Sequence, residues 1–321
     1  MSAPSDTHIH ASASPAARNG VVLMLLGMLM FSLNDVMGKW LVSTYSVGQV
    51  VFIRSVAALI ILAPFIWFNG PEKLFQVDRP RLQLLRAVLS TVEVFAFYFA
   101  VVYLPLADVM TYWLAAPIYV AAVSPFILKE PVGWRRWSAI IIGFVGVVIA
   151  LEPSSQALTP QAIISILGSV AFAFMLLLGR SLRGTPDTTL VFWQIVGAGA
   201  AGLVAIVFDW KPVSVRDLLL LGLLGVVAML AHVLVNRALK LADAATVAPL
   251  QYTLLFWAIV FGWLVFGDVP RMSMLIGSGF IVASGLFIFF REQQLKRQGR
   301  IKTLNQTVVA GSGDGAGPGN G

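Results

Sequence analysis

Six ionisable side chains lie inside long apolar stretches of this 321-residue sequence, and they are the residues best suited to chemistry. They are Asp35, Lys39, Arg54, Arg86, Glu93 and His232. If those stretches cross a bilayer, each charged group costs at least about 2.5 kcal/mol unless it faces protein or water. We therefore treat these positions as candidates for binding a solute or coupling to an ion.

Position along the apolar stretches separates the six residues. Lys39 and Arg86 lie near the ends of their stretches, so both are expected to reach the lipid headgroups. Asp35 and Lys39 are four residues apart, on one face of a helix, where an acid and a base can pair. That alternative, in which Asp35 is only structural, stays open at this point.

Enzyme chemistry has no support in the sequence. No Walker lysine motif, HExxH, GxSxG or paired metal-ligand spacing occurs, and the chain has no cysteine to act as a nucleophile or thiolate ligand. We expect no catalytic residue, no metal site and no cofactor. A membrane enzyme or a sensor without transport remains the alternative from another class.

The elements that must position these residues are transmembrane helices. Hydrophobic residues make up 58% of the chain and charged residues only 12%, about half the share of a soluble domain. A helix needs about 20 apolar residues to cross the bilayer. Ten runs meet that requirement, which predicts an all-α integral membrane protein: 21–42, 47–68, 82–102, 107–128, 134–151, 162–179, 189–208, 217–236, 243–266 and 272–290.

The ends of the chain differ in composition from the spans. We expect residues 1–19 to be a disordered tail, and residues 291–321 to be a basic and then glycine-rich tail. Most lysines and arginines fall on the side of the membrane that carries both tails, which predicts cytoplasmic termini in the cell inner membrane. The net charge of +7 then needs no nucleic-acid partner. The bilayer and a small-molecule solute are the expected partners, and a homodimer stays open.

An internal repeat divides the chain into two halves, residues 20–151 and 162–290. The segment LPLADVMTYWLAAP at 104–117 returns as LKLADAATVAPLQY at 239–252, and FIRSVAA at 52–58 matches FWQIVGA at 192–198. Five spans in each half reverse the second half relative to the first, as in many secondary transporters. The spans are therefore expected to form two inverted five-helix repeats.

Comparison of the halves singles out particular polar residues. Lys39 corresponds to Arg180, whereas Asp35 corresponds to Leu176 and Glu93 to Ala228. The fold does not require those two carboxylates, so they are the leading candidates for binding or coupling. Arg54, which corresponds to Gln194, is the third. Further polar and aromatic candidates are Asn34, Tyr112, Trp113, Trp193, Gln194, His232, Gln251 and Tyr252, while Pro117, Pro125 and Pro249 are expected to kink their helices.

These features resemble the drug/metabolite transporters with two EamA domains. The likeness lies in the five-plus-five layout, the two LAD segments, and Glu130 and Asp268 at the start of the fifth and tenth helices. It implies alternating-access transport without ATP hydrolysis. FSLNDVMGKWL and FIRSVAALIIL resemble bacterial riboflavin-uptake members, so riboflavin is the first expected substrate, with amino-acid or drug export as the alternative.

Overall fold

The computed structural model describes residues 15–75, 77, 79–127, 133–151, 159–182, 184–241 and 248–313. Its described part is helical and contains ten helical spans long and apolar enough to cross a membrane, as the sequence predicts. The first half holds α1 (Pro15–Val42), α2 (Val47–Asn69), η1 (Pro71–Leu74), α3 (Pro80–Tyr103), α4 (Leu106–Leu114), α5 (Ala116–Ile127) and α6 (Trp134–Leu151). The second half holds α7 (Pro160–Ser181), α8 (Asp187–Ile206), α9 (Val215–Leu241), η2 (Ala248–Tyr252), α11 (Thr253–Phe266) and α12 (Met272–Gly313).

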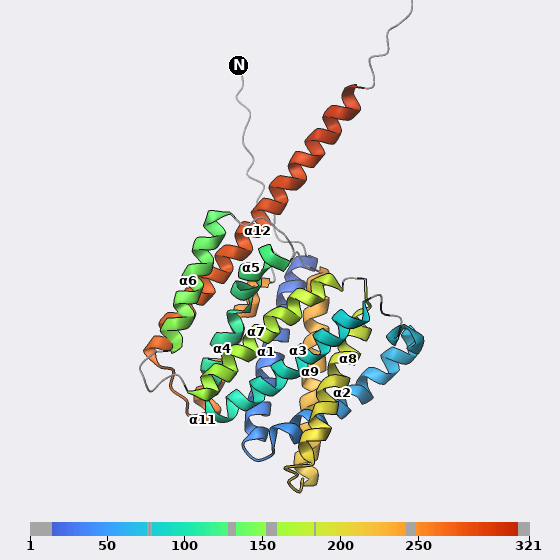
Figure 1. Cartoon of the computed structure of the whole chain (residues 1–321), viewed down its shortest axis with the longest axis vertical. Coiled ribbons are helices and arrows are strands. Elements are labelled where there is room, and N and C mark those ends of the chain that lie inside the picture. Colours follow the sequence, from blue (N-terminus) through green and yellow to red (C-terminus); the bar gives the residue numbers. More distant parts are fainter. Residues whose placement is uncertain are drawn as a thin grey trace, which may run out of the picture.

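Both ends of the described chain emerge from the same face of the bundle (Figure 1). We call this the terminal face and the opposite one the distal face. Helix α1 runs from the terminal face to the distal face, and α12 returns from the distal face. Helix α1 begins at Pro15, within the predicted tail, and α12 continues to Gly313, well beyond the predicted span end at residue 290.

Helix packing reveals the relation between the halves. Helix α1 packs against α9 and α3 against α7, while α2 packs on α8, α6 on α12 and α4 on α11. Exchanging each helix for its equivalent in the other half turns the α1–α9 pair into the α7–α3 pair. The same exchange leaves the pairs α2–α8, α6–α12 and α4–α11 unchanged. This is the pattern of a two-fold axis between inverted repeats, and it confirms the predicted architecture.

Proline sets the shape of the fourth span. The predicted helix over 107–128 is divided into α4 and α5 at Ala115, because Pro117 has no N–H to bond to the carbonyl of Trp113. The expected kink at this proline is confirmed. Pro125 lies inside α5 without ending it, and Pro249 lies in the 3-10 segment η2 that precedes α11.

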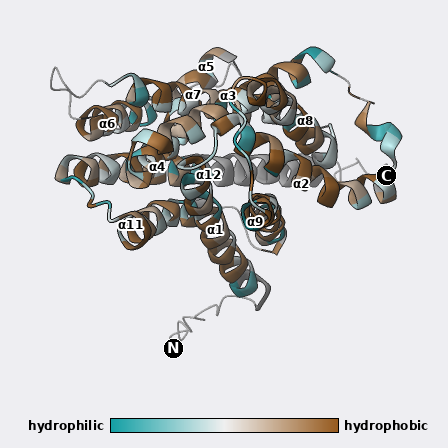
Figure 2. Ribbon diagram, turned by 90° about the horizontal axis from the view of Figure 1, so that it is seen from below, coloured by the Kyte–Doolittle hydropathy of each residue, from teal (hydrophilic) through white to brown (hydrophobic). Residues whose placement is uncertain are grey.

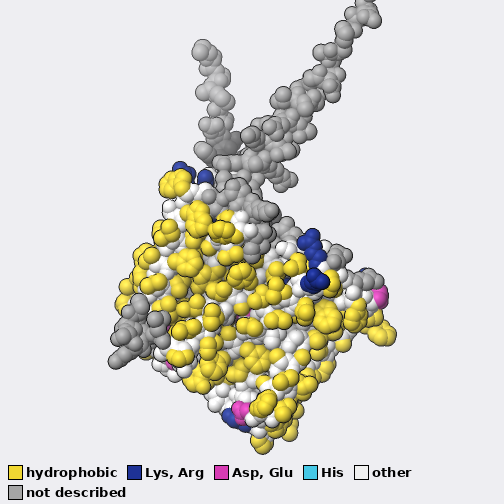
Figure 3. Space-filling model, in the orientation of Figure 1, with side chains coloured by type: hydrophobic (Ala, Val, Ile, Leu, Met, Phe, Trp, Pro, Cys, Tyr) yellow, Lys and Arg dark blue, Asp and Glu magenta, His cyan; other side chains and the backbone are white. Residues whose placement is uncertain are grey.

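Most residues of the helices are hydrophobic (Figure 2), and apolar side chains cover most of the face seen in Figure 3. Phe68, Phe126 and Leu219 are among the large apolar residues that remain exposed. A soluble protein rarely leaves so much contiguous apolar surface uncovered, so this surface fits a lipid environment.

Glycines bring α6 and α12 into close contact. A Cβ placed on Gly277 would lie 2.5 Å from the carbonyl oxygen of Gly146 and 2.6 Å from the backbone nitrogen of Ala150. The two helices approach this closely only because no side chain stands between them. They form a scaffold at one side of the bundle, beside α4 and α5 (Figure 1).

Candidate functional site

Two carboxylates from the first half lie inside the bundle, and each is bonded to a neutral donor. The amide of Asn34 donates to Asp35 on α1 over 3.1 Å. The indole N–H of Trp113 on α4 donates to Glu93 on α3 over 2.9 Å. Among the described residues, no lysine or arginine nitrogen lies within 4.0 Å of either carboxylate. Both carboxylates therefore keep acceptor capacity for a further donor.

A single arginine lies near both carboxylates. Arg54 on α2 donates a hydrogen bond to the hydroxyl of Tyr98 on α3, and its guanidinium carbon lies 5.3 Å from the centre of the tyrosine ring. It also interacts electrostatically with Asp35 and with Glu93, without a direct ion pair. Tyr98 is fully buried and therefore fixes the guanidinium in place. We call Asp35, Arg54 and Glu93 the central charge cluster.

The second half contributes His232 to the surroundings of this cluster. Its ring, on α9, stands edge-on to Phe31 of α1 with 4.8 Å between the ring centres. Arg54 interacts electrostatically with His232 as well. Because α1 and α9 belong to different halves, the cluster lies where the two repeats meet.

Aromatic rings form one wall of the cluster. Phe97 stands edge-on to both Tyr98 and Trp113, with ring centres 5.4 Å apart in each case. Trp113 thus has its N–H committed to Glu93 and its ring packed against Phe97. All three rings are buried, so in this conformation they form a rigid aromatic backing beside the cluster.

Six of the sequence-predicted residues gather at this place: Asn34, Asp35, Arg54, Glu93, Trp113 and His232. Trp193 and Gln194 do not gather there. The indole of Trp193 donates to the carbonyl of Leu74 over 2.9 Å, and Gln194 accepts from Arg86 over 3.4 Å. These two residues of α8 hold η1 and α3 in this conformation.

The remaining predicted residues occupy other environments. Tyr112 is buried on α4, one turn after Asp108. Gln251 is exposed and Tyr252 is partly buried, both on η2. The hydroxyl of Tyr252 fills the space over Gly285 of α12.

One alternative for the basic residues needs correction. Lys39 does not pair with Asp35, because its ammonium lies 2.8 Å from the carboxylate of Asp268. Arg86 donates to the carbonyl of Leu190 over 3.2 Å. Both cations find partners in the other half, which is less costly than leaving a charge at the edge of the apolar layer.

Sequence reasoning missed the partners of these charges. Asp108 pairs with Arg271 over 2.9 Å, and neither residue was a site candidate. A signal was available, because Asp108 and Asp268 both belong to segments that the repeat duplicates. From the sequence alone, however, a charged residue near the end of a span that has an ion-pair partner looks the same as one that is only solvated. The two are distinguished once the helices are placed in three dimensions.

The described residues form ten apolar helices in two inverted repeats, with half-buried charges where the repeats meet, and these features define a multi-pass membrane protein. The model of the EamA-like transporter family matches residues 18–151 and again residues 159–290. The chain belongs to this family of transporters.

Several proteins resemble the whole membrane region. The S-adenosylmethionine uptake transporter of Rickettsia bellii is 26% identical over 86% of this chain and 94% of its own length. The riboflavin transporter of Rhizobium johnstonii is 26% identical, covering 87% and 93%, and that of Vibrio cholerae is 26% identical, covering 88% and 96%. A solved crystal structure with a TM-score of 0.58 and 14% identity covers 88% of this chain and shares the fold.

Proposed function

We propose that this protein is a secondary transporter that takes up a small organic metabolite by alternating access, with the central charge cluster as its binding site. The observation that carries this is the meeting of Asp35, Arg54 and Glu93 with His232 at the junction of the repeats. Inverted-repeat carriers bind their solutes at this junction, near the middle of the bilayer. The relative in Rickettsia bellii is named as an uptake transporter, which supports the direction.

The charge of the cluster points to a solute that carries a positive group. Two carboxylates face one arginine, and the arginine is already bonded to Tyr98. With both carboxylates ionised, the site holds one uncompensated negative charge, which is costly inside a membrane. A bound cation would remove that cost, so we favour a cationic solute over a neutral one.

S-adenosylmethionine meets this requirement and is the first candidate. Its sulfonium and ammonium groups suit Asp35 and Glu93, and its carboxylate suits Arg54. Its purine is a flat ring that suits aromatic surroundings such as Phe97 and Trp113, which are buried in this conformation and would have to uncover a ring face to stack on it. The relative in Rickettsia bellii supports this choice.

Riboflavin is the second candidate, favoured by the same aromatic wall and by the relatives in Rhizobium and Vibrio. It is uncharged at neutral pH, so it would not neutralise the negative charge of the cluster. A proton bound to Asp35 or Glu93 would have to do so. Amino-acid or drug export remains the alternative if neither compound is transported.

Uptake by proteoliposomes distinguishes these candidates. Purified protein is reconstituted with and without proton and sodium gradients, and accumulation of radiolabelled S-adenosylmethionine and riboflavin is followed. S-adenosylhomocysteine is the matched competitor, since it differs in lacking the sulfonium methyl group and its charge. We expect it to compete at least about tenfold less well than S-adenosylmethionine. Accumulation of riboflavin alone would favour the second candidate, and accumulation of neither would reject both substrates.

The basic residues on the terminal face support placement in the inner membrane with cytoplasmic termini. Arg135 and Arg237 are exposed on the turns or helix ends of that face. Because cytoplasmic loops are enriched in such residues, we assign the distal face to the exterior.

A further inference from the structure

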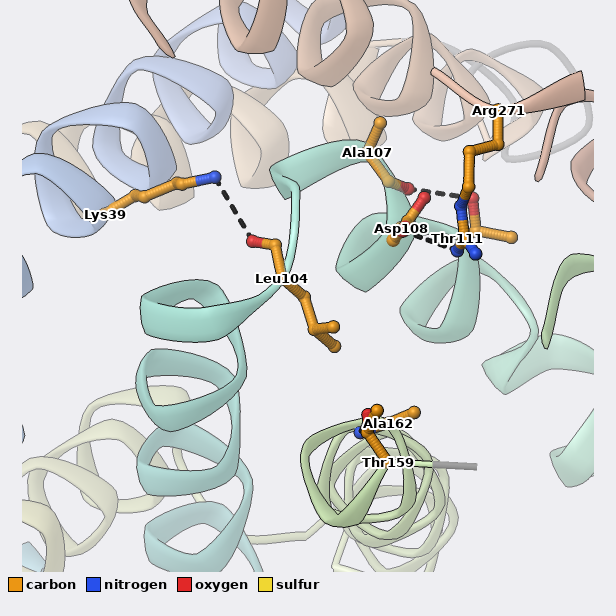
Figure 4. A network of polar contacts seen from close by, with 8 residues as sticks. All are labelled: Lys39, Leu104, Ala107, Asp108, Thr111, Thr159, Ala162 and Arg271. Carbon is orange, nitrogen blue, oxygen red and sulfur yellow. Dashed lines mark hydrogen bonds and ion pairs between the residues drawn. The ribbon is translucent and has the colours of Figure 1, made fainter. Parts of the chain in front are cut away.

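Lys39 forms a bridge between the halves at the distal end of α1. Its ammonium lies 2.8 Å from Asp268, in the turn between α11 and α12, and 3.2 Å from the carbonyl oxygen of Leu104, between α3 and α4 (Figure 4 shows the contact with Leu104). It also lies 4.6 Å from the centre of the Phe266 ring. One ammonium therefore joins the ends of four helices.

A second ion pair crosses between the halves on the same face. Arg271, just before α12, donates to Asp108 in the first turn of α4 over 2.9 Å (Figure 4). The carboxylate of Asp108 is buried, while Arg271 is partly exposed. Asp108 also interacts electrostatically with Lys39 and Asp268, so the two pairs form one network.

This network holds every ion pair found among the described residues, and both pairs lie on the distal face. Two hydrogen bonds outside the ion pairs also join the halves at the distal ends of the helices: the hydroxyl of Tyr45 donates to the carboxylate of Asp217 over 2.5 Å, and the amide of Gln49 donates to the carbonyl of Lys211 over 2.7 Å. Each of these contacts joins the first half to the second. The distal ends of the repeats are therefore held together.

The network lies between the central charge cluster and the distal face. Asp35 is one helical turn below Lys39 on α1, which places it about 6 Å deeper in the membrane. A solute that approached Asp35 along α1 from the distal side would have to pass Lys39 and its partners.

We propose that the pairs Lys39–Asp268 and Asp108–Arg271 form an ionic gate that closes the distal entrance to the central charge cluster. Such a gate is reversible, because Lys39, Asp268 and Arg271 keep part of their side chains exposed, so water can solvate these charges once the pairs separate. In the alternate conformation the two pairs part and the cluster opens to the distal face. This mechanism does not depend on the identity of the substrate.

Thiol labelling tests the gate directly, because the chain has no cysteine and any introduced thiol is unique. Asn34→Cys places the reporter in the cluster, where the native side chain is 5% exposed. Phe208→Cys is the matched control on the distal face, where the native side chain is 86% exposed. A membrane-impermeant maleimide is added to sealed vesicles whose outer surface carries the distal face. Labelling of the Phe208→Cys control identifies these vesicles.

Three variants of the first pair are compared, each on its folded, monodisperse fraction. Lys39→Glu sets two carboxylates against each other and should raise the labelling rate of the Asn34→Cys thiol at least about fivefold. The combined change of Lys39→Glu with Asp268→Lys restores an ion pair of reversed direction and should return the rate to its starting value. Asp268→Asn keeps the side-chain volume and serves as the milder variant if the charge reversal does not fold.

A purely structural role for the pair predicts a different result. Lys39→Glu would then lower the melting temperature and the combined change would restore it, while the labelling rate of the folded fraction stayed constant. That outcome, or equal labelling rates in Asp268→Asn and the parent, would overturn the gate. The rate of the Phe208→Cys control should be the same in every background.

Discussion

Trp113 donates its indole N–H to the carboxylate of Glu93 over 2.9 Å, so an aromatic residue of α4 orients a half-buried acid of α3. This bond joins two residues that lie 20 positions apart in the sequence into one structural unit. It also fixes the distance between the aromatic wall and the central charge cluster.

Removing the donor tests that unit. A hydrogen bond to a charged group contributes about 1.5–3 kcal/mol, so Trp113→Phe, which keeps a ring but loses the N–H, should raise KM for uptake about tenfold. Glu93→Gln removes the charge and should reduce the uptake rate more strongly, with a melting temperature in detergent close to that of the parent. Full transport in Glu93→Gln would show that the charge is not used.

Asp35 is predicted to act independently of Lys39. Because Lys39 already pairs with Asp268, Asp35→Asn leaves no unpaired cation, and it should reduce uptake at least about tenfold without loss of stability. Adding Lys39→Met should not restore uptake. Recovery of transport in the double variant would mean that Asp35 serves only to balance Lys39.

The scaffold contact between α6 and α12 makes a prediction about stability rather than transport. Gly277→Ala places a methyl group against backbone atoms of α6, so it should destabilise the fold by about 1–3 kcal/mol and lower the melting temperature. Gly279→Ala on the same helix is the control, since nothing lies within 4 Å of its Cβ position. Equal melting temperatures for the two variants would contradict the close approach of these helices.

The orientation in the membrane is tested by reporter fusions. A fluorescent protein that folds only in the cytoplasm should be active when fused after Gly321, because basic residues dominate the terminal face. Alkaline phosphatase at the same position should be inactive. Active phosphatase there would reverse the assignment of the two faces, and with it the direction proposed for the gate.

Much of the architecture can be predicted from local sequence. The number of spans follows from run length and hydropathy, which belong to each segment alone. The break at Pro117 is also local, because proline lacks the N–H wherever the helix lies. The inverted repeats follow from the duplicated segments and the odd number of spans. Asp35, Arg54 and Glu93 could be selected as candidates, since a charge inside an apolar run needs a partner or water whichever residue supplies it.

The partners of those charges depend on tertiary structure. The sequence offers Lys39 a carboxylate four residues away at Asp35, whereas the fold pairs it with Asp268, 229 residues further on. Likewise, Trp193 and Gln194 were candidates from the sequence in the same way as Trp113. The packing of α8 nevertheless turns them toward η1 and α3. Helix periodicity places residues on a face of their own helix. Which helix that face meets is decided by the packing of all ten spans together, and so is the division of buried charges between a central cluster and a distal network.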